Sequence, residues 1–83
     1  MKEVTLLYFA GVRDLLGRAE ERASLPDDVR TIADVRAWLV RERPALADRM
    51  EWVRLARNER FAVDEDAIAS GDVIALIPPV AGG

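Results

Sequence analysis

The residues best suited to chemistry in this sequence of 83 are the last two, Gly82 and Gly83, which follow Pro78-Pro79-Val80-Ala81. Glycine lacks a Cβ atom, so a Gly-Gly segment passes through a channel that excludes larger side chains and presents a bare terminal carboxylate. The two prolines restrict φ, and Pro79 also pushes Pro78 toward extended dihedral angles. We therefore expect residues 78–83 to form an extended tail that delivers the carboxylate of Gly83 into the active site of another protein.

A terminal carboxylate, with a pKa of about 3.5, is ionised and unreactive at neutral pH, so it must be activated before it reacts. Adenylation converts it into an acyl electrophile. Sulfur then attacks to give a thiocarboxylate, or an amine attacks to give an amide, and both outcomes stay open at this point. The sequence has no glycine-rich phosphate-binding loop, so we expect a partner enzyme to supply the ATP chemistry.

Composition excludes most other chemistry. Cysteine and histidine are absent and Lys2 is the only lysine, which removes thiolate nucleophiles, imidazole bases, disulfides and the common zinc sites. The net charge is −3, with both signs spread along the chain and no basic stripe for nucleic acid. No signal peptide or membrane-spanning run is predicted. We expect a cytoplasmic protein that binds no metal or cofactor itself and contacts neither nucleic acid nor membrane.

Two continuous apolar runs, residues 4–9 and 73–77, predict strands that are covered on both faces and lie in the middle of a sheet. Residues 10–16 have helical spacing of apolar positions, and Gly17 is suited to end that short helix in the left-handed conformation. Residues 20–25 alternate between polar and apolar and predict a weaker strand.

The main helix is predicted to begin at Thr31, because Thr31 and Asp34 have the spacing of a capping box, and to end near Arg43. Residues 52–56 and 60–63 predict a hairpin around the dipeptide at 58–59. Trp38 and Trp52 are interpreted as core anchors.

This order of elements fits the β-grasp (ubiquitin-like) architecture of the α+β class: a mixed sheet, one main helix across it, and short extra helices. We expect one domain over residues 1–77, followed by the tail at 78–83. In this architecture the last strand leaves from the centre of the sheet.

Four apolar residues, Phe9, Phe61, Ile77 and Val80, lie near the ends of predicted strands. Taken singly, each is better explained by core packing. Together they are able to form an exposed docking patch, with Arg13 beside them on the short helix. Core packing predicts that these side chains are buried, and a docking patch predicts that they are exposed.

Two motifs carry a resemblance to a known family: LYFAGVRDLLG at 7–17 and SGDVIALIPPVAGG at 70–83. They resemble the MoaD type of ubiquitin-like sulfur carrier, the small subunit of molybdopterin synthase. The resemblance implies that an adenylating, activating enzyme uses ATP on Gly83 and that sulfur is installed as a thiocarboxylate. It further implies that the tail enters the large subunit of a heterotetrameric synthase and donates sulfur to cyclic pyranopterin monophosphate during molybdenum cofactor biosynthesis. The chain alone would then be non-catalytic.

The resemblance also implies a partner-binding role for Phe9, Arg13, Ile77 and Val80, and for Phe61 in the hairpin. The family often has an aromatic residue where Ile77 stands. Three alternatives remain: a sulfur carrier for a thiamine or amino-acid pathway, a ubiquitin-like modifier that is joined to lysines of other proteins, and a plain interaction domain whose tail takes part in no chemistry.

Overall fold

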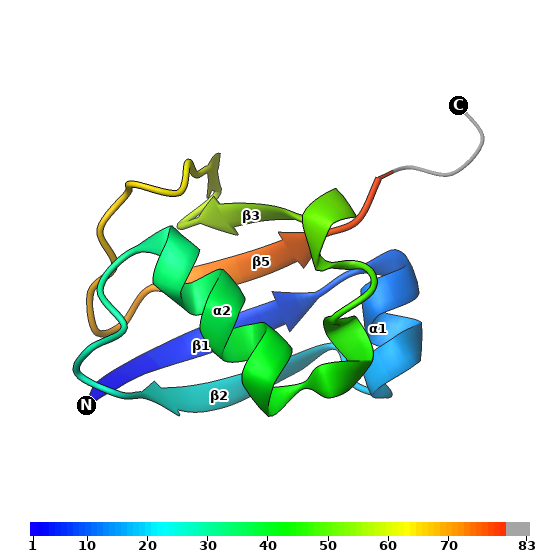
Figure 1. Cartoon of the computed structure of the whole chain (residues 1–83), viewed down its shortest axis with the longest axis horizontal. Coiled ribbons are helices and arrows are strands. Elements are labelled where there is room, and N and C mark those ends of the chain that lie inside the picture. The colour runs from blue at the N-terminus through cyan, green and yellow to red at the C-terminus, as the bar shows by residue number, and fades with distance from the viewer. Residues whose placement is uncertain (80–83) are drawn as a thin grey trace.

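The structure is a computed structural model, and it describes residues 1–79. The strands are β1 (Lys2–Tyr8), β2 (Glu20–Leu25), β3 (Arg54–Arg57), β4 (Arg60–Phe61) and β5 (Val73–Ile77). They form one mixed sheet in the order β2-β1-β5-β3-β4, with β1 and β5 parallel at its centre and the other pairs antiparallel. Helix α2 (Ile32–Glu42) crosses one face, as Figure 1 shows. The predicted α+β β-grasp fold is therefore confirmed.

The two central strands are buried on one face only. Leu6 in β1 and Ile74 and Leu76 in β5 are fully buried under α2, whereas Leu7 and Ala75, on the other face, are partly exposed. The predicted central position of these strands is confirmed, but their predicted burial on both faces is wrong. The second half of β1 and all of β5 are apolar on both faces, yet the helices described in this chain cover only one.

Helix α2 begins with the predicted capping box. The Asp34 N–H donates to Thr31 Oγ1 at 3.3 Å, and the Thr31 N–H donates to an Asp34 carboxylate oxygen at 3.2 Å. These two bonds satisfy amide groups that otherwise lack a partner in the first turn. The helix ends at Glu42, just before Arg43, as predicted.

Helix α1 (Ala10–Leu16) follows β1 after a single residue, Phe9. It buries Val12 and ends at Gly17, whose φ of 73° lies in the left-handed region. The Gly17 N–H donates to the Arg13 carbonyl at 2.8 Å, so the predicted helix and its glycine stop are both confirmed.

The predicted hairpin is present as β3 and β4. Its loop residues Asn58 and Glu59 have φ of 51° and 72°, the left-handed values that a two-residue type I′ turn requires at both positions. The first strand begins at Arg54 rather than at Trp52, because residues 50–52 form a short 3₁₀ helix, η2 (Met50–Trp52). A similar turn, η1 (Pro44–Leu46), follows α2.

The two tryptophans behave differently. Trp38, on α2, is buried as predicted, but Trp52 is 64% exposed, so its predicted role as a core anchor is wrong. A 3₁₀ helix has three residues per turn, so positions three apart share a side. Met50 and the following Val53 both point into the core, which leaves Trp52 on the outside.

None of the helices in the described part of the chain combines the length and apolar composition needed to cross a lipid bilayer.

Candidate docking groove and tail exit

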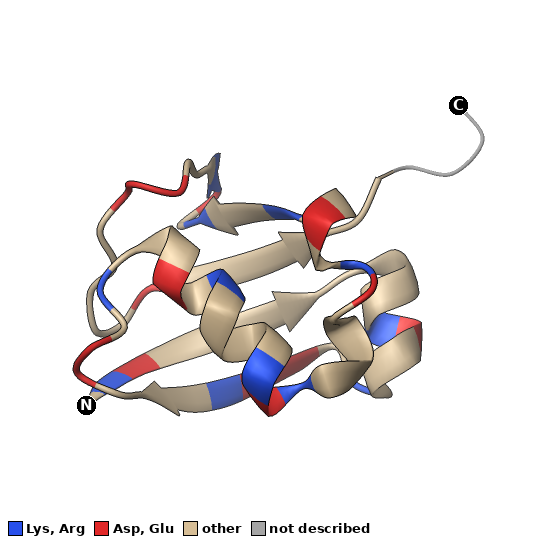
Figure 2. Ribbon diagram, in the orientation of Figure 1, with Lys and Arg blue, Asp and Glu red and all other residues tan. Residues whose placement is uncertain are grey.

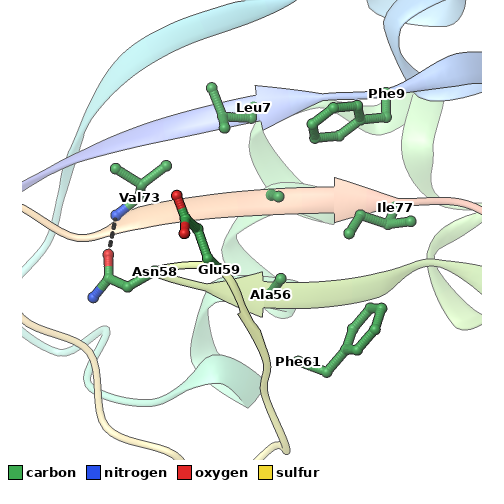
Figure 3. Close-up of a pocket in the computed structure, with 9 residues that line it drawn as sticks. Leu7, Phe9, Ala56, Asn58, Glu59, Phe61, Val73 and Ile77 are labelled. Atoms are coloured by element: carbon green, nitrogen blue, oxygen red, sulfur yellow. Dashed lines mark hydrogen bonds between the residues drawn. The ribbon is translucent and has the colours of Figure 1, made fainter.

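The open face of the sheet carries a shallow groove of about 550 Å³, which we call the sheet groove (Figure 3). It is lined by Leu7, Phe9, Ala56, Asn58, Glu59, Phe61, Val73, Ala75 and Ile77. Figure 2 shows that β5 and the second half of β1 carry no charged residue, so the floor of the groove is apolar. Of the lining residues, only Glu59 is ionisable.

Strand register explains the hollow. Ala75 in β5 pairs with Leu7 on one side and with Ala56 on the other, and Ala56 in turn pairs with Phe61. The two adjacent alanines keep the floor low, while the larger side chains around them form a rim. Phe9 and Phe61 on that rim are 45% and 56% exposed. Exposed aromatic residues around an apolar hollow are typical of a protein interaction site.

Arg54 packs against Phe61 on the rim of the groove. Its guanidinium carbon lies 3.7 Å from the centroid of the Phe61 ring, within the range of a cation–π interaction. Arg54 also pairs in register with Ile77, so the three side chains lie at the same end of the groove. Arg54 was not among the predicted docking residues, although its position two residues before Ala56 in a strand places the two on the same face.

The hairpin is anchored to β5 by a buried carboxylate. Asp72 is 5% exposed and accepts hydrogen bonds from Arg57 Nε at 2.6 Å, the Ala69 N–H at 2.7 Å and Asn58 Nδ2 at 3.0 Å. Burial opposes ionisation, but the hydrogen bonds from Arg57, Ala69 and Asn58 outweigh it and lower the pKa of Asp72. Asn58 Oδ1 also accepts from the Val73 N–H at 2.9 Å. These bonds fix the register that brings Phe61 to the groove.

A second polar network lies on the helix-covered face. The Tyr8 hydroxyl donates to Glu21, and Arg43 donates to the same Glu21 oxygen at 2.8 and 3.1 Å. Burial, followed by the hydrogen bond to Glu21, raises the pKa of Tyr8. Burial of Glu21 is outweighed by its bonds from Tyr8 and Arg43, so its pKa is lowered. The network ties the end of β1 to the end of α2 and thereby holds Phe9, the next residue, in place.

The described chain leaves the sheet at its centre, as expected for this architecture. The parallel register pairs Tyr8 with Leu76, so Phe9 and Ile77 follow side by side at the same end of the sheet. Pro78 is partly buried and Pro79 is exposed, and both lie outside regular secondary structure. The predicted tail residues Val80, Ala81, Gly82 and Gly83 lie outside the described residues.

The structure brings together three of the predicted docking residues, Phe9, Phe61 and Ile77, in the sheet groove. Arg13 is exposed on α1 and does not line that groove. Leu7, Val73 and Ala75 were missed, although each lies two or four residues before a predicted member on the same strand face. That period-two spacing is the signal that identifies them.

Comparison with known proteins gives a consistent picture. The ThiS family model matches residues 6–83. The molybdopterin synthase sulfur carrier subunit of Chlamydomonas reinhardtii is 34% identical over 98% of this chain and 99% of its own length. The subunit of the same name from Mycobacterium tuberculosis is 35% identical over the full length of both. Small archaeal modifier protein 1 of Haloferax volcanii is 32% identical, covering 90% of this chain and 94% of its own.

Solved structures agree with these matches. The crystal structure of SAMP1 from Haloferax volcanii has a TM-score of 0.84 and 30% identity, and covers 98% of this chain and 99% of that one. A complex of subunits 1 and 2 of the molybdopterin-converting factor from Helicobacter pylori gives a TM-score of 0.71 at 23% identity, covering 98% of this chain and 99% of that chain. Caldiarchaeum subterraneum ubiquitin gives 0.63 at 19% identity over 99% and 98% of the two chains. The last two matches support the ubiquitin-like fold alone. By its sequence and its fold, the chain belongs to the ThiS family.

Proposed function

We propose that this chain is the sulfur carrier of molybdopterin synthase. In this proposal a partner enzyme adenylates the Gly83 carboxylate and sulfur then converts it to a thiocarboxylate. The thiocarboxylate donates its sulfur to cyclic pyranopterin monophosphate inside the large subunit of the synthase. The observation that carries the proposal is the exposed apolar groove beside the end of β5, in a chain that is about one-third identical over its whole length to molybdopterin synthase sulfur carrier subunits.

The sheet groove supports a role for this chain in binding, with catalysis supplied by its partners. Its lining offers apolar contact but no nucleophile and only one carboxylate, Glu59, so it is suited to binding rather than to catalysis. Phe9 and Ile77, at the end where the chain leaves the sheet, belong to the same groove. A partner that covers the sheet groove therefore lies directly beside the base of the tail.

The proposed chemistry consists of two substitutions that an activating enzyme carries out, the first at phosphorus and the second at the acyl carbon. The Gly83 carboxylate oxygen attacks the α-phosphorus of ATP, and pyrophosphate leaves. A sulfur nucleophile then attacks the acyl carbon, and AMP leaves with the bonding electron pair. With hydrosulfide as the nucleophile, loss of its S–H proton then leaves the terminus as a thiocarboxylate anion.

Intact-mass analysis tests this proposal. The full chain is incubated with an activating enzyme, ATP and a sulfur source, and we expect a mass change equal to replacement of one oxygen by sulfur at the C-terminus. A variant lacking Gly83 should fold normally, with an unchanged melting temperature, and should show no such change. An unmodified mass, in a system that sulfurates another carrier, would refute the proposal.

A second candidate is a protein modifier, because small archaeal modifier proteins 1 and 3 of Haloferax volcanii are 32% and 33% identical to this chain. In that case the activated terminus reacts with an amine and not with sulfur. Immunoblots of cell extracts distinguish the two: a ladder of slower-migrating conjugates favours the modifier, and a single free species favours the carrier.

A further inference from the structure

The exposed tryptophan of this chain is not explained by the sheet groove. Trp52 is 64% exposed and does not line that groove, unlike the exposed aromatic residues Phe9 and Phe61. Tryptophan is buried on average in folded proteins, and at interfaces it is enriched among the residues that dominate binding. A side chain of this size on the surface therefore indicates a second contact.

The backbone on either side of Trp52 is fixed by hydrogen bonds from a side chain of α2. Arg36, on α2, donates from Nη1 to the carbonyl oxygens of Met50 at 3.1 Å and Val53 at 2.8 Å, the residues that flank the exposed position. The Trp52 N–H itself donates to the Arg49 carbonyl at 2.9 Å. The indole is thus presented on a fixed turn, and binding through it would require little ordering of the backbone.

Trp52 lies on the wall of a second groove, of about 530 Å³, which we call the tail-base groove. Its lining includes Phe9, Arg49, Trp52, Ile77, Pro78 and Pro79. Phe9 and Ile77 also line the sheet groove, so the two hollows are continuous around the end of β5. A protein seated on the sheet groove reaches the tail-base groove without a gap.

Arg49 gives this groove a charge preference. It is the only charged residue in the lining, and one guanidinium nitrogen lies 3.7 Å from where a Cβ atom on Gly11 would stand. Within residues 1–79 the Arg49 side chain forms no ion pair. A carboxylate from a partner would therefore meet an available guanidinium next to an apolar surface.

We propose that the tail-base groove binds a segment of the large synthase subunit that carries an apolar side chain next to an aspartate or glutamate. Trp52 anchors the apolar side chain and Arg49 pairs with the carboxylate. This inference rests on the proposed function and adds a contact at the tail's point of departure. Fixing Pro78 and Pro79 there leaves four residues, a reach of about 14 Å when extended, for entry into the partner's active site.

Calorimetric titration of the full chain with the large subunit of the same organism tests the proposal. Trp52→Ala should lower the affinity by tenfold or more, as expected for a central aromatic anchor, and Arg49→Glu by at least about fivefold. Val63→Ala is the matched control, because Val63 is 61% exposed but lines neither groove, and its affinity should stay unchanged. Melting temperatures of all variants should match the unmodified chain, since each substituted side chain is exposed.

A direct readout uses the chain labelled with 5-fluorotryptophan, which gives one fluorine signal for Trp38 and one for Trp52. Trp52→Phe assigns the signals. We expect the Trp52 signal to shift and to lose its solvent exposure in the complex, while that of the buried Trp38 stays in place. Binding by Trp52→Ala with unchanged affinity, or an unmoved Trp52 signal in the complex, would overturn the tail-base contact alone. Failure of the unmodified chain to bind the large subunit would overturn both this inference and the proposed synthase partnership.

Discussion

The two faces of the sheet are built from the same strands but serve different ends. On the helix-covered face Leu6, Ile74 and Leu76 are fully buried, whereas on the open face the neighbouring Leu7, Ala75 and Ile77 remain partly exposed. Both sets are apolar. The difference teaches that apolar sequence does not by itself define the core: one face stabilises this chain, and in the proposed function the other binds a partner.

Adjacent residues of β5 sharpen this comparison most strongly. Leu76→Ala removes a fully buried side chain and should lower the free energy of unfolding by about 2–5 kcal/mol through lost burial and the resulting cavity. Ile77→Ala, one residue later on the open face, should cost less than half as much. Urea denaturation of the two variants measures the difference. Equal losses would show that the open face contributes to stability as much as the core does.

Affinity for the partner should show the reverse order, with open-face substitutions having the larger effect. Phe61→Ala removes a rim side chain that is 56% exposed, so stability should change little while affinity for the large synthase subunit falls about tenfold or more. Ile77→Ala should act in the same direction. Surface plasmon resonance on folded variants provides the measurement. Full affinity in both variants would break the assignment of the open face to docking.

A pH titration of stability tests the buried Asp72 carboxylate, which anchors the hairpin to β5. The pKa of Asp72 is lowered from its usual value of 3.8 in the folded state, so its contribution to stability is present above that value. The contribution is lost as the pH falls below 3.8 toward the lower folded-state pKa. Asp72→Asn should lower stability at pH 7 and flatten this acid-side dependence. Urea midpoints across pH 2.5–7 measure it, and an unchanged slope would contradict the proposed role.

The smallest effect is expected at the rim. Arg54→Gln removes the cation–π contact with Phe61 and should cost about 0.5–1 kcal/mol or less, because the pair is exposed. Partner affinity should fall by a few-fold as the Phe61 ring loses its support. Arg54→Lys, which keeps the charge, serves as the control, and an equal loss in Lys and Gln variants would point to guanidinium stacking as the important element.

Local signals made much of the fold predictable. The Thr31 and Asp34 capping box and Gly17 at the end of α1 depend on residues close in sequence, and the structure confirms them. The hairpin turn at 58–59 follows from the two strand-like runs on either side of that dipeptide, and positive φ at both positions confirms the two-residue loop.

Features that depend on distant residues were harder to predict. Trp52 was assigned to the core because tryptophan usually packs there. The turn that exposes it is fixed by Arg36 on α2, which is distant in the sequence. The central strands were expected to be buried on both faces because their sequences are continuously apolar. An apolar run does not tell whether its second face is covered by this chain or by another. The contact of Arg54 with Phe61 is diagonal across the hairpin, because Phe61 pairs in register with Ala56, so strand pairing alone does not predict it.

The most direct test of the account follows methyl signals of the isotope-labelled chain while the large synthase subunit is added. We predict that the signals of Leu7, Ala75 and Ile77 shift or broaden, while those of Leu6, Ile74 and Leu76, from the same two strands, stay close to their free positions. Perturbation confined to the α2 side or to the β2 edge, with the open-face signals unmoved, would contradict the claim that the open face of the sheet is the docking surface.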